Sequence, residues 1–293
     1  MRPLYHRLQE ARRRLGVPWE IIERDYLLSW ILAGISCSAS LRGTLAFKGG
    51  TALKKCFFGE YGFSEDLDFS ALDRAPRAEA LEEALRACCQ STMAMLDEVA
   101  PVQIVRSRYT ETQPHPQGQE AYTIRCRFPW HREPYTRVKI EITFDKPILK
   151  PVQLRNILHN YEEPLDAKVQ TYALEEMVAE KLRAILQHIQ RLKQRGWSRS
   201  RARDYYDLWR IMDKYSGELD LSGFVTFLRE KCAARDVGFD GPGSFFEESM
   251  MSYVSRTWEQ WLGQLVPDLT PYETVIEELR PRIEAVLMPG TRS

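Results

Sequence analysis

Cysteine and histidine are sparse in this sequence, and their spacing matches no metal-binding or disulfide pattern. The six cysteines include no Cys-x-x-Cys pair, and the five histidines include no His-x-x-x-His pair. Such pairs are usual at zinc sites, whereas disulfide-bonded scaffolds are short chains that are dense in cysteine. The sequence therefore predicts neither a zinc centre nor a disulfide framework.

Long hydrophobic runs are also missing. The longest stretch without a charged residue, 26–41, has 16 residues and includes four serines and a glycine. A membrane-spanning helix needs about 20 predominantly apolar residues. No apolar segment with a small-residue cleavage site directly follows the N-terminal arginines, so the sequence predicts no signal peptide. We expect a cytoplasmic protein that does not interact with a membrane, with residues 26–41 in a buried helix.

Net charge is zero, because 41 basic residues balance 41 acidic ones, so the chain as a whole gives no sign of nucleic-acid binding. Residues 181–203 differ, since they contain eight basic residues and no acidic one. Such a segment can neutralise a phosphate backbone, and an exposed tryptophan can stack on an unpaired base. The alternative is a solvated helix end balanced by acids elsewhere. The residues predicted to bind RNA are Arg191, Lys193, Arg195, Trp197, Arg199 and Arg201.

A short strand at 45–47 is followed by Lys48 and then Gly-Gly-Thr at 49–51. The two glycines let the backbone approach a ligand closely, and the threonine opens a helix whose free N–H groups attract anions. A tight turn without a ligand is the alternative. This segment predicts a phosphate-binding turn.

Two carboxylates follow about fifteen residues later, at Asp66 and Asp68. On a strand both side chains emerge from one face, because successive side chains alternate in direction. Mg²⁺ commonly takes one or two carboxylates together with substrate phosphates. The order of glycine turn and Asp-x-Asp strand favours a nucleotidyltransferase over a solvated acidic strand.

A third carboxylate, Glu141, lies on the polar face of an alternating strand at 137–144. A site with two metal ions requires more than two acids, so Glu141 is a candidate metal ligand or base. An exposed Lys139–Glu141 surface pair explains the pattern equally well.

Hydrophobic periodicity predicts helices at 4–15, 19–36, 52–58, 78–99, 172–194 and 202–212, and strands at 45–47, 66–70, 102–109, 121–128 and 137–144. A polar loop separates the third and fourth strands, and residues 215–288 read as further helices. Composition changes from strand-like to helical near Pro147 and Pro151. We therefore expect a first domain at 1–150 and a helical second domain at 151–293.

Charged side chains also lie near the apolar faces of the later helices. Asp204 and Asp207 share a helix face with Leu208, and an unpaired charge there would be costly. Lys181 and Arg203 are the candidate partners. Ion pairing and a role near the nucleotide are compatible with each other.

Four segments in order resemble the motifs of the AbiEii/AbiGii toxin nucleotidyltransferases. They are Gly-Gly-Thr at 49–51 with Phe-Ser-Glu-Asp-Leu-Asp-Phe at 63–69, Glu-Ile-Thr at 141–143, Glu-Lys-Leu-Arg-Ala at 180–184, and Arg-Asp-Tyr-Tyr-Asp-Leu at 203–208. The resemblance implies an α+β fold, with a polymerase-β-like nucleotidyltransferase domain containing a mixed sheet, followed by a helical domain that completes the active site.

The resemblance also implies a function and roles for the matching residues. The protein would be the toxin of a bacterial toxin–antitoxin or phage-abortive pair, partnered by a cognate antitoxin. It would use Mg²⁺ to transfer a nucleotide from an NTP to an RNA, with the tRNA 3′ end as the expected acceptor. The implied metal ligands are Asp66, Asp68 and Glu141. The implied catalytic residues are Asp66, Asp68, Glu141, Lys181 and Asp204. The implied nucleotide-binding residues are Lys48, Gly49, Gly50, Thr51, Lys181 and Arg203.

Two alternatives remain at the level of sequence. One is a nucleotidyltransferase that modifies a small molecule or a protein hydroxyl, which the basic segment at 181–203 argues against. The other is a binding protein that keeps the fold without turnover. The clustered acids argue against this second reading, because a site without chemistry has no physical need for them.

Overall fold

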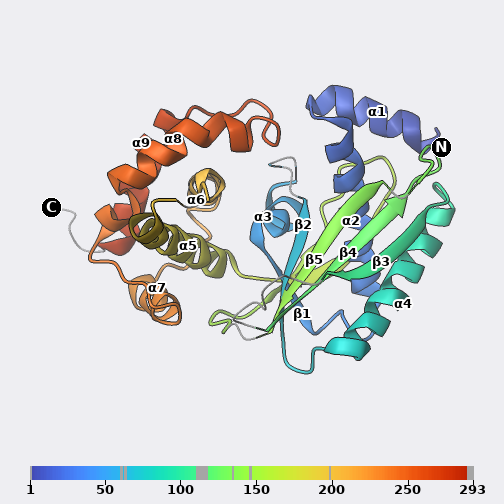
Figure 1. The fold of residues 1–293 in the computed structure, drawn as a ribbon, viewed down its shortest axis with the longest axis horizontal. Helices are drawn as coiled ribbons and strands as arrows, with labels where there is room; N and C mark the ends of the chain where they lie inside the picture. Colours follow the sequence, from blue (N-terminus) through green and yellow to red (C-terminus); the bar gives the residue numbers. More distant parts are fainter. Residues whose placement is uncertain are drawn as a thin grey trace. The chain divides into compact units, whose positions relative to one another are not determined.

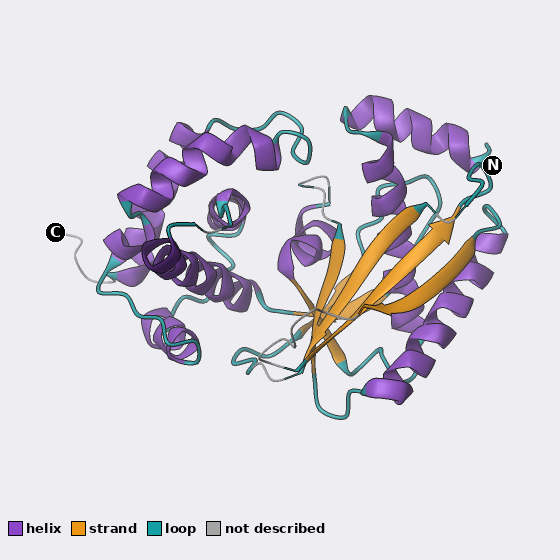
Figure 2. Ribbon diagram, viewed as in Figure 1, coloured by secondary structure: helices purple, strands orange, loops and turns teal. Residues whose placement is uncertain are grey.

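A computed structural model of the protein describes residues 2–59, 62, 65–109, 118–133, 135–144, 147–197 and 199–288. Residues 63 and 64 of the Asp-x-Asp segment, and residues 110–117 of the expected polar loop, lie outside these ranges. The chain divides into two compact units, Met1–Tyr172 and Ala173–Ser293. Figure 1 follows the chain through both units, and Figure 2 separates helices from strands.

The first unit combines helices with a mixed sheet of seven strands. Its helices are α1 (Leu4–Leu15), α2 (Trp19–Cys37), α3 (Gly49–Leu53), the π-helical turn η1 (Lys54–Phe58) and α4 (Ala78–Asp97). Its strands are β1 (Leu45–Lys48), β2 (Asp66–Ala71), β3 (Gln103–Tyr109), β4 (Gln119–Arg127), β5 (Thr136–Thr143), β6 (Gln153–Asn156) and β7 (Lys168–Thr171).

The strand order is β3-β4-β5-β2-β1-β7-β6. β1 runs antiparallel to β2 and parallel to β7, and β2 runs parallel to β5. The strands nearest the predicted acidic site therefore lie in the middle of the sheet, where neighbours on both sides fix their register. The mixed sheet and the α+β class are as the sequence predicted.

Helices α2 and α4 pack against each other and against the same face of the sheet (Figure 1). α2 contains most of the charge-free stretch 26–41 and is buried on nearly all sides, as expected for so apolar a helix. The two helices approach closely at Gly34. A Cβ added there would contact the Thr92 hydroxyl and would lie 2.9 Å from the carbonyl oxygen of Cys88.

The second unit is helical. It contains α5 (Leu174–Arg195), α6 (Ala202–Lys214), α7 (Phe224–Ala233), the 3₁₀ turn η2 (Pro242–Phe245), α8 (Glu248–Leu262) and α9 (Tyr272–Leu287). Its core is formed where α5 and α6 meet α7, α8 and α9, with Leu182, Tyr205, Leu208 and Trp258 almost fully buried. Among the described helices of either unit, none has both the length and the apolar character that crossing a bilayer requires.

The sequence missed two strands. β6 and β7 follow Pro151 and pair with each other, and β7 also pairs with β1, so the sheet continues to residue 171. Each has only four residues, and β6 alternates between partly buried and exposed positions, so neither gives the apolar run from which a strand is recognised. The chain consequently divides after Tyr172, later than the composition change near residue 150.

Gly34 provides a test of the α2–α4 packing. We expect Gly34→Ala to destabilise the protein by about 1–3 kcal/mol, because the added methyl group must displace the Cys88 backbone or the Thr92 side chain. Gly43→Ala is the matched control, since a Cβ at Gly43 meets nothing within 4 Å. Urea unfolding monitored by far-UV circular dichroism measures both variants. Equal midpoints for the two would contradict the close approach.

Candidate active site

The three predicted acids lie on adjacent strands of the first unit. β2 and β5 pair in a register that sets Asp68 opposite Glu141 and Asp66 opposite Lys139. On the other side of β2, Lys48 of β1 is opposite Asp68. Leu67 and Phe69 point the other way and are buried in the core, so the alternation predicted for this strand is present. The fold therefore gathers carboxylates and lysines on one face of the sheet.

Like charges raise one another's pKa at this face. Burial and then the charge of Glu141 raise the pKa of Asp68, although Lys48 opposes the shift. Burial and then the charges of Glu141 and Glu65 likewise raise the pKa of Asp66. The protein therefore supplies too little positive charge to balance these carboxylates. A bound cation would supply that charge and relieve the repulsion between them.

Glu141 has a cationic neighbour on its own strand. Its carboxylate pairs with Lys139, and the Lys139 ammonium also lies 4.5 Å from the centre of the Tyr109 ring. Burial alone would lower the pKa of Lys139, but the hydrogen bond and the charge of Glu141 outweigh it and raise the pKa. The Lys139–Glu141 pair is therefore formed, with both side chains half-buried rather than exposed.

The glycine turn lies directly against Asp68. Gly49 has a φ of +81°, in the left-handed region that favours glycine, and a Cβ added there would lie 2.8 Å from Asp68 Oδ2. Only a residue without a side chain allows the turn and the carboxylate to come this close. The positions of Gly49 and Gly50 at the start of α3 agree with the turn predicted from sequence.

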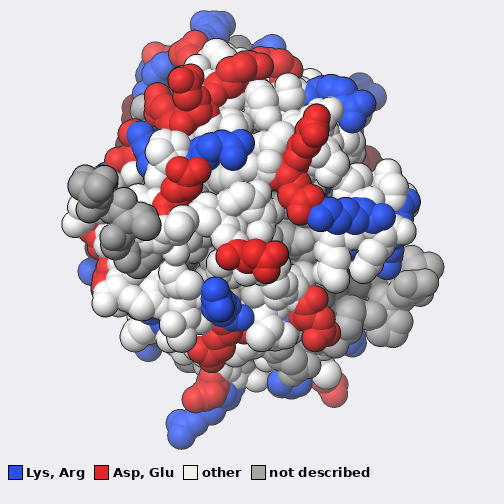
Figure 3. Space-filling view, turned by 90° about the vertical axis from the view of Figure 1, so that its left-hand side faces the viewer, with Lys and Arg blue, Asp and Glu red and all other residues white. Residues whose placement is uncertain are grey.

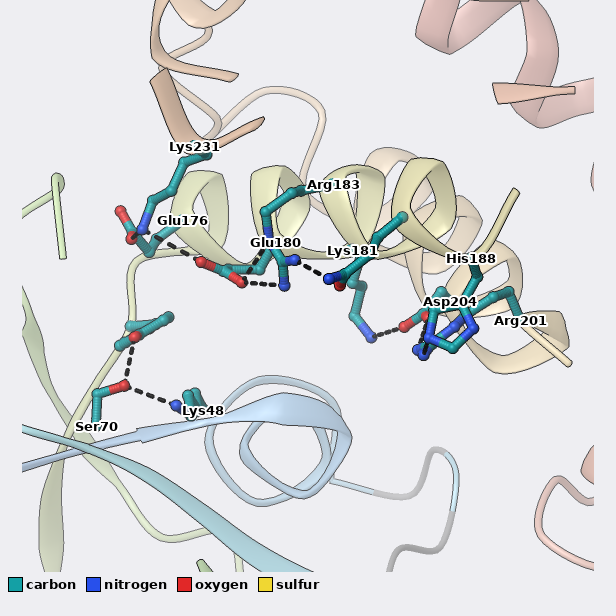
Figure 4. A network of polar contacts seen from close by, with 12 residues as sticks. Lys48, Ser70, Glu176, Glu180, Lys181, Arg183, His188, Arg201, Asp204 and Lys231 are labelled. Carbon is teal, nitrogen blue, oxygen red and sulfur yellow. Dashed lines mark hydrogen bonds and ion pairs between the residues drawn. The ribbon is translucent and has the colours of Figure 1, made fainter. Parts of the chain in front are cut away.

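The side chains around the turn are fixed by hydrogen bonds. The Thr51 hydroxyl, which is buried, donates to the Asp66 carbonyl oxygen at 2.6 Å and so joins α3 to β2. Lys48 Nζ donates to Ser70 Oγ at 2.7 Å, and Ser70 Oγ lies 2.7 Å from the Tyr172 hydroxyl (Figure 4). The Thr51 hydroxyl therefore holds the glycine turn in place against β2.

Buried ion pairs hold the segment that follows the turn. Lys55 Nζ lies 2.8 Å from Asp25 Oδ2 and donates to Ser29 Oγ at 2.8 Å, so η1 is attached to α2. Lys54 Nζ lies 3.7 Å from Asp25 Oδ1, and the Tyr161 hydroxyl donates to Asp25 Oδ2 at 3.0 Å. Burial would raise the pKa of Asp25, but the charges of Lys54 and Lys55 outweigh it and lower the pKa.

The carboxylates of this face suit a divalent cation that binds few protein ligands. Among the described residues, no group of three or more histidine, cysteine or acidic side chains is arranged as a metal site. Mg²⁺ does not need such a group, because it commonly binds one or two carboxylates and completes its shell with substrate phosphates and water. Asp66 and Asp68, with raised pKa values and a glycine turn beside them, fit that mode.

In the second unit, Lys181 of α5 lies between two carboxylates of α6. Its Nζ is 3.2 Å from Asp204 Oδ1 and also contacts Asp207 Oδ2 (Figure 4 shows Lys181 and Asp204). Burial alone would lower the pKa of Lys181, but the charges of Asp207 and Asp204 outweigh it and raise the pKa. The carboxylates that the sequence placed near the core face are therefore paired with Lys181, as expected.

The second partner of Asp204 is Arg201. Its Nη1 lies 2.8 Å from Asp204 Oδ2, and its Nη2 donates to Nε2 of the buried His188. Burial, and then the charge of Arg201, lower the pKa of His188 to about 3, so this ring is neutral and accepts. Arg203 also lies near Lys181, and its positive charge acts to lower the pKa of Lys181. Arg201, which was predicted to contact RNA, is thus held by Asp204 and His188.

The other residues that were predicted to bind RNA are exposed. Arg191, Arg195 and Arg199 are on the surface, and the Trp197 side chain is 66% exposed. Lys193 is exposed as well and pairs with Glu247 at 2.6 Å. On the face drawn in Figure 3, basic and acidic side chains are interspersed with uncharged ones, and an acidic group lies close to the centre.

A family model described as nucleotidyl transferase AbiEii toxin, type IV TA system, matches residues 30–288. The chain belongs to this AbiEii family of nucleotidyltransferase toxins. Its fold is similar to that of MenT4, a nucleotidyltransferase toxin from Mycobacterium tuberculosis H37Rv, with a TM-score of 0.63 and 20% sequence identity over 96% of this chain and 89% of that one. No curated protein sequence matches the chain.

Membership of the AbiEii family confirms the resemblance given by the four motifs. It identifies the chain as a toxin nucleotidyltransferase of a type IV toxin–antitoxin system, for which an NTP substrate and an antitoxin partner are implied. The acceptor, the metal and the roles of individual residues do not follow from membership alone.

The sequence reasoning on this AbiEii-family chain missed several supporting residues. Asp25 and Lys55 form the buried pair beneath the turn, and His188 and Arg201 hold Asp204. One signal was available for Asp25, which is the last charged residue before the apolar stretch 26–41. An acid next to an apolar helical stretch requires a cation, but the sequence does not say which lysine supplies it.

Asp204 allows a test that depends on pH. Burial would raise its pKa, but Lys181 and Arg201 outweigh burial and lower the pKa from 3.8 to about 2. Its contribution to stability is therefore complete above the unfolded pKa of about 4 and is lost as the pH falls through about 2. We expect Asp204→Asn to lower the free energy of unfolding by about 1.5–3 kcal/mol at pH 7, with the difference shrinking between about pH 4 and pH 2.

The control is Asp213→Asn. The Asp213 side chain is 52% exposed and pairs with Arg282 at 3.1 Å, so its loss should change stability little at any pH. Urea unfolding of the wild type and both variants at a series of pH values measures these differences. A constant difference down to pH 2 for Asp204→Asn would show that the carboxylate is not held ionised by its partners.

Proposed function

We propose that this toxin transfers a nucleotide from an NTP to the 3′-hydroxyl of an RNA, with the tRNA 3′ end as the acceptor. The observation that carries the proposal is the placement of Asp66 and Asp68 on one face of β2, against the Gly49 turn and opposite Glu141. The exposed basic segment at the end of α5 favours a large polyanionic acceptor.

We assign the triphosphate to the glycine turn. The backbone N–H groups at the start of α3 are free of side chains at Gly49 and Gly50, so they can approach phosphate oxygens closely. Lys48 is opposite Asp68 in the strand register, and its positive charge acts on Asp68. The Thr51 hydroxyl acts by holding the turn against β2, through its hydrogen bond to the Asp66 carbonyl oxygen, rather than by binding phosphate.

We assign Mg²⁺ to Asp66 and Asp68, with Glu141 as a third ligand or as the base. When bound, Mg²⁺ would supply positive charge for the transferred phosphoryl group and for the departing pyrophosphate. Release of Glu141 from Lys139 would make its carboxylate available for either role. In-line attack of the RNA 3′-hydroxyl on the α-phosphate then releases pyrophosphate, and the proton of the hydroxyl passes to a carboxylate or to water.

The roles of Lys181, Arg203 and Asp204 rest on their motifs. We propose that Lys181 and Arg203 bind phosphate oxygens and that Asp204 orients Lys181. A charge that is held between Asp204 and Asp207 is fixed in position, which is what electrostatic stabilisation of a transition state requires.

Transfer to a small molecule or a protein hydroxyl remains the second candidate. Incubation of the protein with each NTP in turn and with total RNA, followed by sequencing of RNA 3′ ends, distinguishes the two. Added nucleotides at RNA ends support the proposal. Nucleotide transfer that is found only on protein or on small molecules overturns the RNA acceptor. Absence of transfer to any acceptor would indicate that the protein binds its partners without turnover.

Asp68→Asn tests the acidic site. We expect nucleotide transfer to fall by at least about a hundredfold, the scale seen when one stabilising group is removed. Thermal stability should be unchanged or higher, because the substitution removes repulsion from Glu141. Asp73→Asn, at an exposed acid in the turn after β2, is the control and should retain full activity. Wild-type transfer rates in Asp68→Asn would remove Asp68 from the site.

The basic segment predicts a strong dependence of RNA affinity on salt. The double variant Arg195→Gln, Arg199→Gln should reduce the slope of log K against log salt concentration by about 1.4–1.8, since each phosphate contact contributes about 0.7–0.9. Arg12→Gln, Arg13→Gln removes two exposed arginines from α1 and serves as the matched control. Fluorescence anisotropy with tRNA measures both slopes. An identical slope for the wild type and the α5 variant would remove this segment from RNA binding.

A further inference from the structure

A pocket of about 520 Å³ lies in the second unit, between the C-terminal half of α5 and the segment 237–247. Its walls include the apolar side chains of Leu186, Ile189, Val237 and Phe239, and its polar groups include Gln190 and Asp240. The volume lies within the range of about 300–1,000 Å³ that is typical of small-ligand sites. Of its lining residues, only Lys193 has a role assigned above, in RNA binding.

The pocket is held open by contacts of its own. The Phe239 ring packs against the buried Phe245 ring, with centroids 5.3 Å apart, and the Arg229 guanidinium lies 5.6 Å from the Phe239 centroid. Lys193 and Glu247 form an ion pair across the lining, which connects α5 to the segment before α8. A wall fixed in this way loses little conformational entropy when a ligand enters.

Positive charge gathers beside the pocket. Gln190 and Lys193, which line it, alternate along α5 with the exposed Arg191 and Arg195. Burial, and then the nearby guanidinium groups of Arg195, Arg201, Arg183 and Arg199, lower the pKa of Arg191. An anionic chain that follows these arginines would therefore pass the mouth of the pocket.

We infer that this pocket receives one unstacked base of the RNA, while the phosphates of that RNA contact the exposed arginines at the end of α5. The inference rests on the proposed function, since it assigns a subsite to the RNA acceptor. A base has two apolar faces and a polar edge, which matches apolar walls with Gln190 and Asp240 among them. A peptide side chain would match the apolar walls but would leave the surrounding guanidinium groups without phosphates.

The polar groups also imply a preference among bases. A carboxylate accepts hydrogen bonds from an exocyclic amino group, as in the pairing of Asp or Glu with the cytosine amino group. Uracil has no such group and presents a carbonyl oxygen instead. The pocket should therefore favour cytosine over uracil through Asp240.

Phe239→Ala tests the pocket separately from the arginines. With a single-stranded oligocytidylate, we expect its affinity to fall about tenfold, because a stacking surface is lost, whereas the salt slope stays unchanged because no phosphate contact is lost. Phe227→Ala, at a half-buried phenylalanine of α7 outside the pocket, is the matched control and should bind as the wild type does. Circular dichroism and thermal midpoints confirm that each variant is folded.

Asp240→Asn provides the second arm, because Asp240 is exposed and its substitution should leave the fold intact. The wild type should bind oligocytidylate more tightly than oligouridylate, and Asp240→Asn should reduce that difference. If both variants bind each oligonucleotide as the wild type does, the pocket inference is overturned while RNA transfer stands. If Phe239→Ala weakens binding of the antitoxin but not of RNA, the occupant is a peptide and the inference is also overturned. If the wild type neither binds RNA nor extends it, the proposed function is overturned, and the pocket inference that rests on it is overturned as well.

Discussion

The buried pairing of Asp25 with Lys55 and Lys54 is the constraint on which the first unit depends. It attaches the turn η1 to α2, and α3, which begins at Gly49, continues directly into η1. Removing one member of a buried pair typically costs about 3–5 kcal/mol, because the remaining charge keeps its desolvation penalty. The ion pair therefore fixes the path of the backbone beside Asp68, although none of its members belongs to the acidic face of the sheet.

The acidic face shows the opposite arrangement. Glu141 raises the pKa of both Asp66 and Asp68, so the folded chain keeps carboxylates together at a cost. A neutral residue at one of these positions would be easier to accommodate. Sites that oppose stability in this way are commonly sites of function, because the unfavourable charge becomes favourable once a cation and a substrate are present.

Charge in the second unit is balanced within the unit. Lys181 and Arg201 face Asp204 and Asp207, and the neutral His188 accepts a hydrogen bond from Arg201. Two cations and two anions held in fixed positions form a preorganised group whose side chains need little rearrangement. Among the described residues, the arginines at the end of α5 are exposed at the surface. The basic segment therefore has one part that supports the fold and another part that is available to a polyanion.

The sequence by itself determined the α+β class, the mixed sheet, the acidic strand and the family, because these depend on local alternation, helical periodicity and four motifs in order. It also placed Asp204 and Asp207 on one helix face, since helical spacing decides which side chains share a face, but it left Lys181 and Arg203 as candidate partners. Only the tertiary structure decided that β6 and β7 extend the sheet, that Lys55 is the partner of Asp25, and that Arg201 binds Asp204 instead of lying free on the surface. These pairings join residues distant in sequence or separated by a turn, and their partners are selected by packing and desolvation, which no local pattern encodes.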